Sequence, residues 1–397
     1  MHPNLVILLL ALSIGLQPVS TDLYLPGLPG LALDLQASVG MVQYTLSGLL
    51  LAFGISQLLW GPFSDKVGRR PIMLVGLVMY TVSAVGCVLS PTIEVLVAWR
   101  VVQGVAMGAV ITSARAVVRD LYTPLQGAKV MSKAMTGLGL MACTSPPLGG
   151  FLSQHWGWRV AMTSIVTYAL FTMALVAWRF KETITTRNPN ALHLPTMLRI
   201  WGEVLRHPTF RAFALLSLAA YGALFTYLAS SSFIFIQVLH LTGLQLGWIL
   251  ASMSVVYITG TIVCRFLLRH IGMRKTIALA GLFSLGSGMS LCWMVYGGEP
   301  SALGLVLSMY PMIIAHGIHQ PIGQSGAVGP FPLSAGAASA MNGFLMMLAA
   351  FATGAWLSHS IDGTLFPLVH GVAFWAGVLA LTAWTLVQWH GEPVKAD

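Results

Sequence analysis

One acidic residue, Asp22 in STDLYLP, lies well inside an apolar stretch of this sequence. The other acidic residues fall in polar stretches, at the ends of apolar ones or in the tails. A carboxylate among apolar residues is costly to keep, so it is a functional candidate by default. It could bind and release protons, or attract a cationic molecule when ionised. The alternative is a structural carboxylate that pairs with an arginine or caps a helix break near Pro26.

Two arginines are the matching rarities of another apolar stretch, residues 92–119. At about 100° per residue, Arg100 and Arg115 lie roughly 60° apart around a helix, so both could face one cavity. Gln103 adds a polar group beside Arg100 in WRVVQGVAMGA. A cation there would change the proton affinity of Asp22. Arg100 could instead be a structural hydrogen-bond hub, and Arg115 could extend to the nearby membrane surface.

A second polar set, His316, His319 and Gln320, also lies in an apolar stretch. His316 and Gln320 share a helix face at this spacing, and the histidines could relay protons, bind a substrate or be satisfied core residues. No carboxylate or cysteine is near in sequence, so a metal is not expected. Tyr221 and Phe225 could line an aromatic cavity for flat lipophilic molecules, or could pack or face lipid.

The segment GLGLMACTSPPLGG combines two prolines with two glycines. Pro146 and Pro147 remove two helix donors, and Gly149 and Gly150 loosen the backbone. This segment is therefore predicted to kink or swivel. The alternative is a kink that serves only packing.

The segment GPFSDKVGRR, residues 61–70, concentrates charge in a chain of which only 8% is charged. It is predicted to be a tight cytoplasmic loop between two helices. Asp65 is predicted to stabilise the positive end of a helix that begins near residues 334–338, and one arginine of the loop to pair with Asp120. The loop would then be a latch, or otherwise only a solvated turn. The residues of this prediction are Gly61, Asp65, Gly68, Arg69, Arg70 and Asp120.

These residues belong to a very apolar chain of 397 residues, 56% of them hydrophobic, with a mean hydropathy of +0.81. Too little polar surface remains for a water-soluble globule, so we predict an all-α membrane protein. Apolar runs of about 20 residues can cross a bilayer as helices. We place twelve transmembrane helices at 5–29, 39–61, 71–90, 92–119, 130–153, 159–180, 211–236, 243–268, 275–297, 301–327, 336–358 and 364–389.

Lysine and arginine set the predicted orientation, because basic residues are retained on the cytoplasmic side. Almost all of the 20 fall on one side, which makes both termini cytoplasmic. The polar interval 181–210 is predicted to be a cytoplasmic linker between six-helix halves at 1–180 and 211–397, with an amphipathic surface helix at 194–205. The net charge of +9 then reflects topology and contact with anionic lipid, and no nucleic-acid partner is expected.

Several of these segments resemble the signatures of one known family. GPFSDKVGRR is similar to the loop signature of the major facilitator superfamily, WRVVQGVAMGA to its helix-four signature and SPPLGG to its antiporter signature. STDLYLPGLP and VVRDLY resemble the Bcr/CflA branch, the bicyclomycin and chloramphenicol resistance type of drug/proton antiporter. Ser145 stands where the antiporter signature usually has glycine, and Arg115, His316 and His319 do not map onto the family pattern.

The resemblance implies the major facilitator fold and a proton-driven exporter of the bacterial inner membrane that works by alternating access. It implies that Asp22 is the proton-coupling acid and Arg100 the cavity arginine of helix four. It also implies that Asp65 forms a gating cluster with Arg69 or Arg70.

The expected function is therefore efflux of lipophilic drugs or related small molecules by a monomer in the lipid bilayer, with protons as the coupling ion and no other cofactor. The alternative is a dedicated transporter of one metabolite, such as a sugar, an amino acid or a siderophore. An enzyme is not expected, because the sequence has no clustered His/Asp/Glu motif of the kind an intramembrane metalloenzyme needs.

Overall fold

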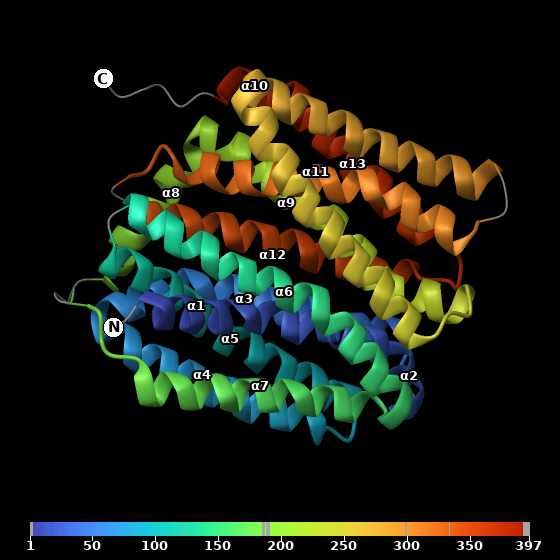
Figure 1. The fold of residues 1–397 in the computed structure, drawn as a ribbon, viewed down its shortest axis with the longest axis horizontal. Coiled ribbons are helices and arrows are strands. Elements are labelled where there is room, and N and C mark those ends of the chain that lie inside the picture. Colours follow the sequence, from blue (N-terminus) through green and yellow to red (C-terminus); the bar gives the residue numbers. More distant parts are fainter. Residues whose placement is uncertain are drawn as a thin grey trace. The chain divides into compact units, whose positions relative to one another are not determined.

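The computed structural model describes residues 3–122, 124–184, 187, 191–297, 300–332 and 334–391 (Figure 1). Every regular element within these ranges is a helix, which confirms the prediction of an all-α chain there. Parts of the predicted linker, at 185–186 and 188–190, and most of the predicted C-terminal tail, at 392–397, lie outside the described residues.

Ten described segments are long and apolar enough to cross a membrane. One of them, α10 (Gly243–Gly297), contains Gly272 at φ 76° and ψ 173°, so two helices meet there. With α10 counted as two, α6 (Pro124–Trp156) completes the twelve predicted helices. The others are α1 (Pro3–Thr21) with η1 (Leu25–Gly27) and α2 (Leu28–Asp34), α3 (Val39–Val67), α4 (Arg69–Val88), α5 (Ile93–Leu121), α7 (Trp158–Arg179), α9 (Pro208–Ser232) with η2 (Phe233–Val238), α11 (Ala302–Val328), α12 (Ala335–Ser360), and α13 (Phe366–Trp384) with α14 (Leu386–His390).

Two differences from the sequence prediction affect the candidate sites. The first span is interrupted after α1 and resumes as η1 and α2, because Pro26 and Pro29 cannot donate the hydrogen bonds of a continuous helix. The second span runs past its predicted end at 61, since α3 accommodates Pro62 and continues to Val67. The expected ten-residue loop is thus reduced to one residue, Gly68, between α3 and α4.

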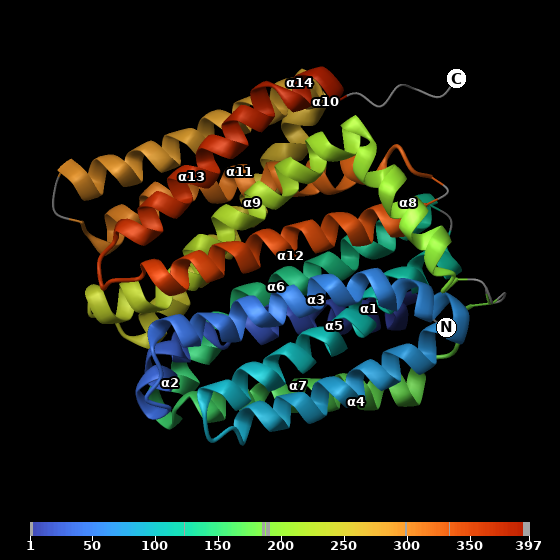
Figure 2. The same cartoon turned by 180° about the vertical axis from the view of Figure 1, so that it is seen from behind.

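The described chain forms two compact units. The first combines Met1–Leu194 with Thr242–Ala251, the first turns of α10. Within it, α5 packs against both α3 and α4, α1 packs against α6, and α7 lies beside α4 (Figure 2). Glycine permits the closest approach of α5 to α3, because a Cβ at Gly104 would overlap the backbone carbonyl of Leu49.

The second unit combines Pro195–Leu241 with Ser252–Asp397. Here α9 packs against α11, α12 and α13 (Figure 1). The helix before α9 is α8 (Leu194–Arg206), which lies where the sequence predicts an amphipathic helix. Leu198 and Leu205 of α8 are exposed, whereas Met197 and Val204 are buried. Exposed leucines on a short helix with a charged face are typical of a helix at a membrane surface.

Candidate functional site

The guanidinium of Arg100 is fully buried in the first unit. Its Nε donates to the backbone oxygen of Thr45 on α3 (3.2 Å), and its Nη1 donates to Oε1 of Gln103 (2.8 Å). Its Nη2 donates to the backbone oxygen of Ser20 on α1 (2.9 Å), and its Cζ lies 4.6 Å from the centroid of the Tyr24 ring. All these acceptors are neutral, and in the described part of the chain no carboxylate lies within 4.0 Å of this guanidinium.

Asp22 lies in the break between α1 and η1, and Ser20 and Tyr24 on either side of it contact Arg100. Because α1 ends at Thr21, the carbonyl of Ser20 lies in the last turn, where carbonyls lack intrahelical donors, and Arg100 fills that place. The amide of Asp22 donates to the Pro18 carbonyl (2.7 Å), and its Oδ1 accepts from Thr21 Oγ1 (2.7 Å). Asp22 is half-buried, and no cationic side chain among the described residues lies within 4.0 Å of it.

Hydroxyl groups extend this site to α3 and α4. The hydroxyl oxygens of Tyr24 and Thr45 are 3.0 Å apart, and Ser20 Oγ contacts the hydroxyl of Tyr80 on α4. Sequence reasoning missed Thr45 and Tyr80 because a neutral hydroxyl is ordinary in a membrane helix. Only the packing of the helices brings Thr45 to Tyr24 and Tyr80 to Ser20. We call Ser20, Tyr24, Thr45, Tyr80, Arg100 and Gln103 the Arg100 cluster.

The proline and glycine segment of α6 packs against the same helix break. α6 runs unbroken through its two prolines. A Cβ at Gly149 would overlap the backbone of Leu23, and one at Gly150 would overlap the carbonyl of Gly243 in α10. The two glycines therefore allow backbone contact on two sides of α6. The swivel expected of this segment stays a prediction.

A second charged cluster lies where α3 ends, α4 begins and α5 ends. Arg69, which is only 3% exposed, donates through Nε to Asp120 Oδ2 (2.8 Å). Its Nη1 lies 2.6 Å from Asp65 Oδ1 and also donates to Ser64 Oγ (2.7 Å). Arg119 extends toward the same oxygen of Asp65, at 3.9 Å. We call Asp65, Arg69 and Asp120 the Arg69 cluster; of the two arginines predicted to reach Asp120, Arg69 does so.

The glycines of this segment differ in role. Gly68 has φ 124° and ψ 157°, a conformation that residues with a Cβ rarely adopt. Gly61 lies within α3, so its prediction as part of a loop is wrong. The other predicted partner of Asp65, the helix start near residues 334–338, belongs to the second unit, and that pairing stays a prediction.

Glu182, which the sequence analysis did not select, caps the start of α4. Its Oε1 accepts from the backbone nitrogen of Arg69 (3.0 Å) and its Oε2 from that of Arg70 (3.1 Å). Oε1 also accepts from the amides of Thr183 (2.9 Å) and Ile184 (3.1 Å). Partial burial alone would raise the pKa of Glu182, but these four donors together hold it below the usual glutamate range.

The two histidines of α11 contact different helices of the second unit. His316 Nδ1 lies 3.0 Å from the carbonyl oxygen of Ala220 on α9. His319 Nε2 lies 3.5 Å from Ser284 Oγ on α10. Both histidines are buried. Each therefore contributes to a separate helix contact.

Gln320 of α11 faces a third helix, α12. Its Nε2 and the Nδ2 of Asn342 lie 3.5 and 3.8 Å from the sulfur of Met346. Sequence reasoning missed Asn342, a lone neutral amide in an apolar stretch. Although His316 and Gln320 are spaced to share a face, their side chains contact different helices. On α9, Tyr221 is half-buried and Phe225 is buried.

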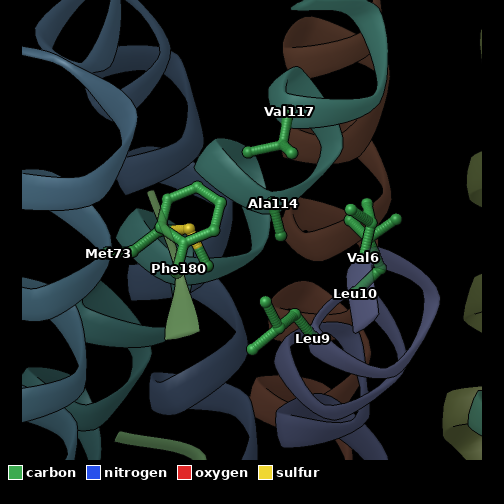
Figure 3. A pocket seen from close by; sticks show the side chains of 7 residues that line it. All are labelled: Val6, Leu9, Leu10, Met73, Ala114, Val117 and Phe180. Carbon is green, nitrogen blue, oxygen red and sulfur yellow. The ribbon is translucent and has the colours of Figure 1, made fainter. Parts of the chain in front are cut away.

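Arg115 is half-buried on α5 and has no hydrogen-bond or ion-pair partner among the described residues. A cavity of about 10 Å³ lies beside α5 and is lined by Ala114 and Val117, but not by Arg115 (Figure 3). Apolar residues of α1 and α4 and Phe180, just after α7, complete its wall. Such a volume is about that of one water molecule, so this cavity does not hold a larger solute.

Comparison with known proteins places the whole chain in context. Residues 10–354 match the family model described as Major Facilitator Superfamily. The chain is 26% identical to "Multidrug resistance protein D" of Escherichia coli (strain K12) over 98% of both chains. It is 26% identical to "Bicyclomycin resistance protein homolog" of Haemophilus influenzae over 77% of both. It is 32% identical to "Uncharacterized MFS-type transporter YdgK" of Bacillus subtilis over 55% of both.

The solved structures show a likeness of fold. The xylose transporter XylE from E. coli, in a partially occluded inward-open conformation, aligns with a TM-score of 0.77 and 15% identity. The alignment covers 100% of this chain and 99% of that one. The human organic anion transporter MFSD10 aligns with a TM-score of 0.66 and 19% identity, over 97% of this chain and 100% of that one.

Proposed function

Since this chain belongs to the major facilitator superfamily, we propose that it exports lipophilic drugs or related small molecules in exchange for protons. The chain is a multi-pass protein of the bacterial inner membrane and a transporter, not an enzyme. Relatives named for multidrug and bicyclomycin resistance support the substrate class. In this proposal protons are the coupling ion, no other cofactor takes part, and a monomer is the working unit.

The observation that carries the proposal is the position of Asp22 at a helix break joined to Arg100. Removal from water favours a neutral carboxylic acid, whereas the uncompensated charge of Arg100 favours a carboxylate. These effects oppose each other, so a small movement of α1 against α5 would change the free energy of proton binding at Asp22. A group with that property is what proton coupling requires.

In the proposed cycle, a compound enters from the cytoplasm or the inner leaflet, and a proton arrives from outside at Asp22. Competition or coupling between the two drives alternating access. Arg100 ties the end of α1 to α3 through the carbonyls of Ser20 and Thr45. A change of charge at Asp22 would therefore act on a junction of three helices. The Arg69 cluster is proposed as the cytoplasmic gate.

The test is transport by purified protein in proteoliposomes, with a panel of lipophilic compounds and an imposed proton gradient. Asp22→Asn is expected to abolish proton release driven by substrate while the protein stays folded. Asp362→Asn makes the same chemical change in an exposed segment after α12 and is expected to match the wild type. Persistent exchange in Asp22→Asn would contradict the proposal. Uptake of one sugar, amino acid or siderophore, without export of the panel, would favour a dedicated transporter instead.

A further inference from the structure

Arg115 differs from Arg100 and Arg69, the buried arginines of the first unit. Arg100 has three acceptors within 3.2 Å, and Arg69 has two carboxylates within 2.8 Å. The described residues supply no acceptor to Arg115. A guanidinium carries five N–H donors, and leaving them unmatched in a membrane helix costs free energy. The unmatched donors point to an acceptor that the chain itself does not provide.

Thr112, one helical turn before Arg115, is a second unmatched donor. Its Oγ1 is buried and has no hydrogen-bond partner among the described residues. A threonine on a helix can donate to the carbonyl four residues earlier, as Thr81 does to Leu77 (2.8 Å), but Thr112 does not. Side chains three residues apart are neighbours on a helix surface, so Thr112 and Arg115 can act on one ligand.

Contacts between α5 and α3 show which edge of α5 carries this pair. A Cβ at Gly61 of α3 would lie 3.7 Å from Cγ2 of Thr112 and would meet no other atom within 4 Å. Further along α5, Arg119 extends to Asp65 of α3. Thr112, Arg115 and Arg119 follow at steps of three and four residues, so Arg115 lies on the same edge. The missing side chain at Gly61 leaves room there.

The charges at this edge favour an anion. Asp65 already lies 2.6 Å from Arg69 and 3.9 Å from Arg119, so its charge is shared by two other arginines. The apolar cavity bounded by Ala114 lies against a different face of α5 (Figure 3). The edge beside Gly61 thus combines a cation and a hydroxyl with open space at Gly61.

We propose that Arg115 and Thr112 bind the acidic group of a transported compound, so that lipophilic carboxylates are among the exported molecules. A carboxylate accepts two parallel hydrogen bonds from a guanidinium, and the hydroxyl of Thr112 supplies a third donor. The open space at Gly61 leaves room for part of the body of such a compound beside the pair. This inference rests on the proposed export function and adds a substrate class to it.

The test uses two probes with the same ring system, pyrenebutyrate and its methyl ester, because only the first carries a charge. Binding is measured by fluorescence with purified protein in nanodiscs of phosphatidylcholine. Arg115→Gln is expected to weaken binding of the acid about tenfold or more, and to leave binding of the ester unchanged. Arg115→Lys keeps the charge and is expected to recover part of the affinity. Arg269→Gln, an exposed arginine of α10, is the matched control.

Equal affinity of the wild type and Arg115→Gln for the acid would overturn the proposal. If Arg115→Gln then also bound less phosphatidylglycerol, Arg115 would belong to the membrane surface and contact lipid headgroups. A wild type that exports the ester through Asp22 but does not bind the acid contradicts only this inference. A wild type that exports no compound of the panel in response to a proton gradient contradicts the proposed function itself.

Discussion

Arg100 and Arg69, the two buried arginines of the first unit, are accommodated in opposite ways. Arg69 lies within 2.8 Å of two carboxylates, Asp65 and Asp120, so its charge is compensated locally. Arg100 donates to two backbone carbonyls and one amide, so its hydrogen bonds are satisfied while its charge is not. A buried charge is costly unless it is paired. The chain therefore keeps an unpaired charge at one site and neutralises it at the other.

The surroundings of the two sites fit this difference. Arg69 begins α4 at a one-residue junction with α3, where a fixed ion pair holds helix ends together. Arg100 contacts the end of α1 next to Asp22, where an uncompensated cation responds to charge gained or lost nearby. We therefore expect loss of Arg69 to lower stability more than loss of Arg100 does, and loss of Arg100 to lower proton coupling at Asp22.

The largest expected effect on stability is that of Arg69→Gln. This change leaves Asp120 without a cation and Asp65 with only the more distant Arg119, at 3.9 Å. We expect the free energy of unfolding to fall by about 3 kcal/mol, the lower end for a broken buried pair, because the side chain of Asp65 is 38% exposed. Denaturant unfolding in detergent, followed by circular dichroism, measures this loss.

A triple variant shows whether charge compensation is the cause of that loss. Asp65→Asn, Arg69→Gln and Asp120→Asn together remove the charges as a set. Because no uncompensated charge remains, we expect most of the lost stability to return. If the triple variant were no more stable than Arg69→Gln alone, the account of the Arg69 cluster as a compensated ion pair would be wrong.

A smaller loss of stability, with a large loss of transport, is expected at Arg100. Arg100→Gln removes the charge and most donors, whereas Arg100→Lys keeps the charge but cannot reach acceptors on three helices at once. We expect about 2 kcal/mol of lost stability in both variants. Transport should fall about tenfold or more in the glutamine variant and less in the lysine variant, measured as proton-coupled export in proteoliposomes. Equal transport by the two variants would show that the charge has no role of its own.

The sequence predicts the helices, Asp22 and two residues of the Arg100 cluster for simple physical reasons. Apolar length decides whether a segment can span a bilayer, so twelve helices could be counted. Charges are rare in such segments, so Asp22 and Arg100 could be selected, and Gln103 lies close to Arg100 by helical spacing. The end of α3 could not be placed, because a proline within a membrane helix does not by itself end it.

Contacts between helices are what the sequence could not show. Tyr80 is neutral and lies in no motif, and it joins Ser20 only because α1 and α4 meet. Glu182 lies in a polar interval where an acid is ordinary, and it caps α4 only because the chain after α7 returns to that helix start. Spacing gives His316 and Gln320 a shared face, but the neighbouring helices decide their partners.

The smallest expected effect is that of Glu182→Gln. It tests whether the charge of a third acid, beside Asp65 and Asp120, stabilises the start of α4 at Arg69. The pKa of Glu182 is lowered in the folded protein, so its carboxylate stabilises the fold at pH values above the usual pKa range of glutamate. That contribution is lost as the pH falls through the lowered pKa. Glutamine keeps one oxygen, which can accept from the amide of Arg69, but its NH2 group cannot accept from the amide of Arg70, and it brings no charge to the start of α4.

We expect Glu182→Gln to lower the free energy of unfolding by about 0.5 kcal/mol at pH 7, a small value because Glu182 is exposed. Unfolding curves of the variant and the wild type should converge as the pH falls, because the wild-type carboxylate becomes protonated. Glu203→Gln, an exposed acid of α8, should leave the stability nearly unchanged at both ends of the pH range. If the stability difference between Glu182→Gln and the wild type persisted in acid, hydrogen-bond geometry, and not charge, would hold the start of α4. Charge compensation near Arg69 would then come from Asp65 and Asp120 alone.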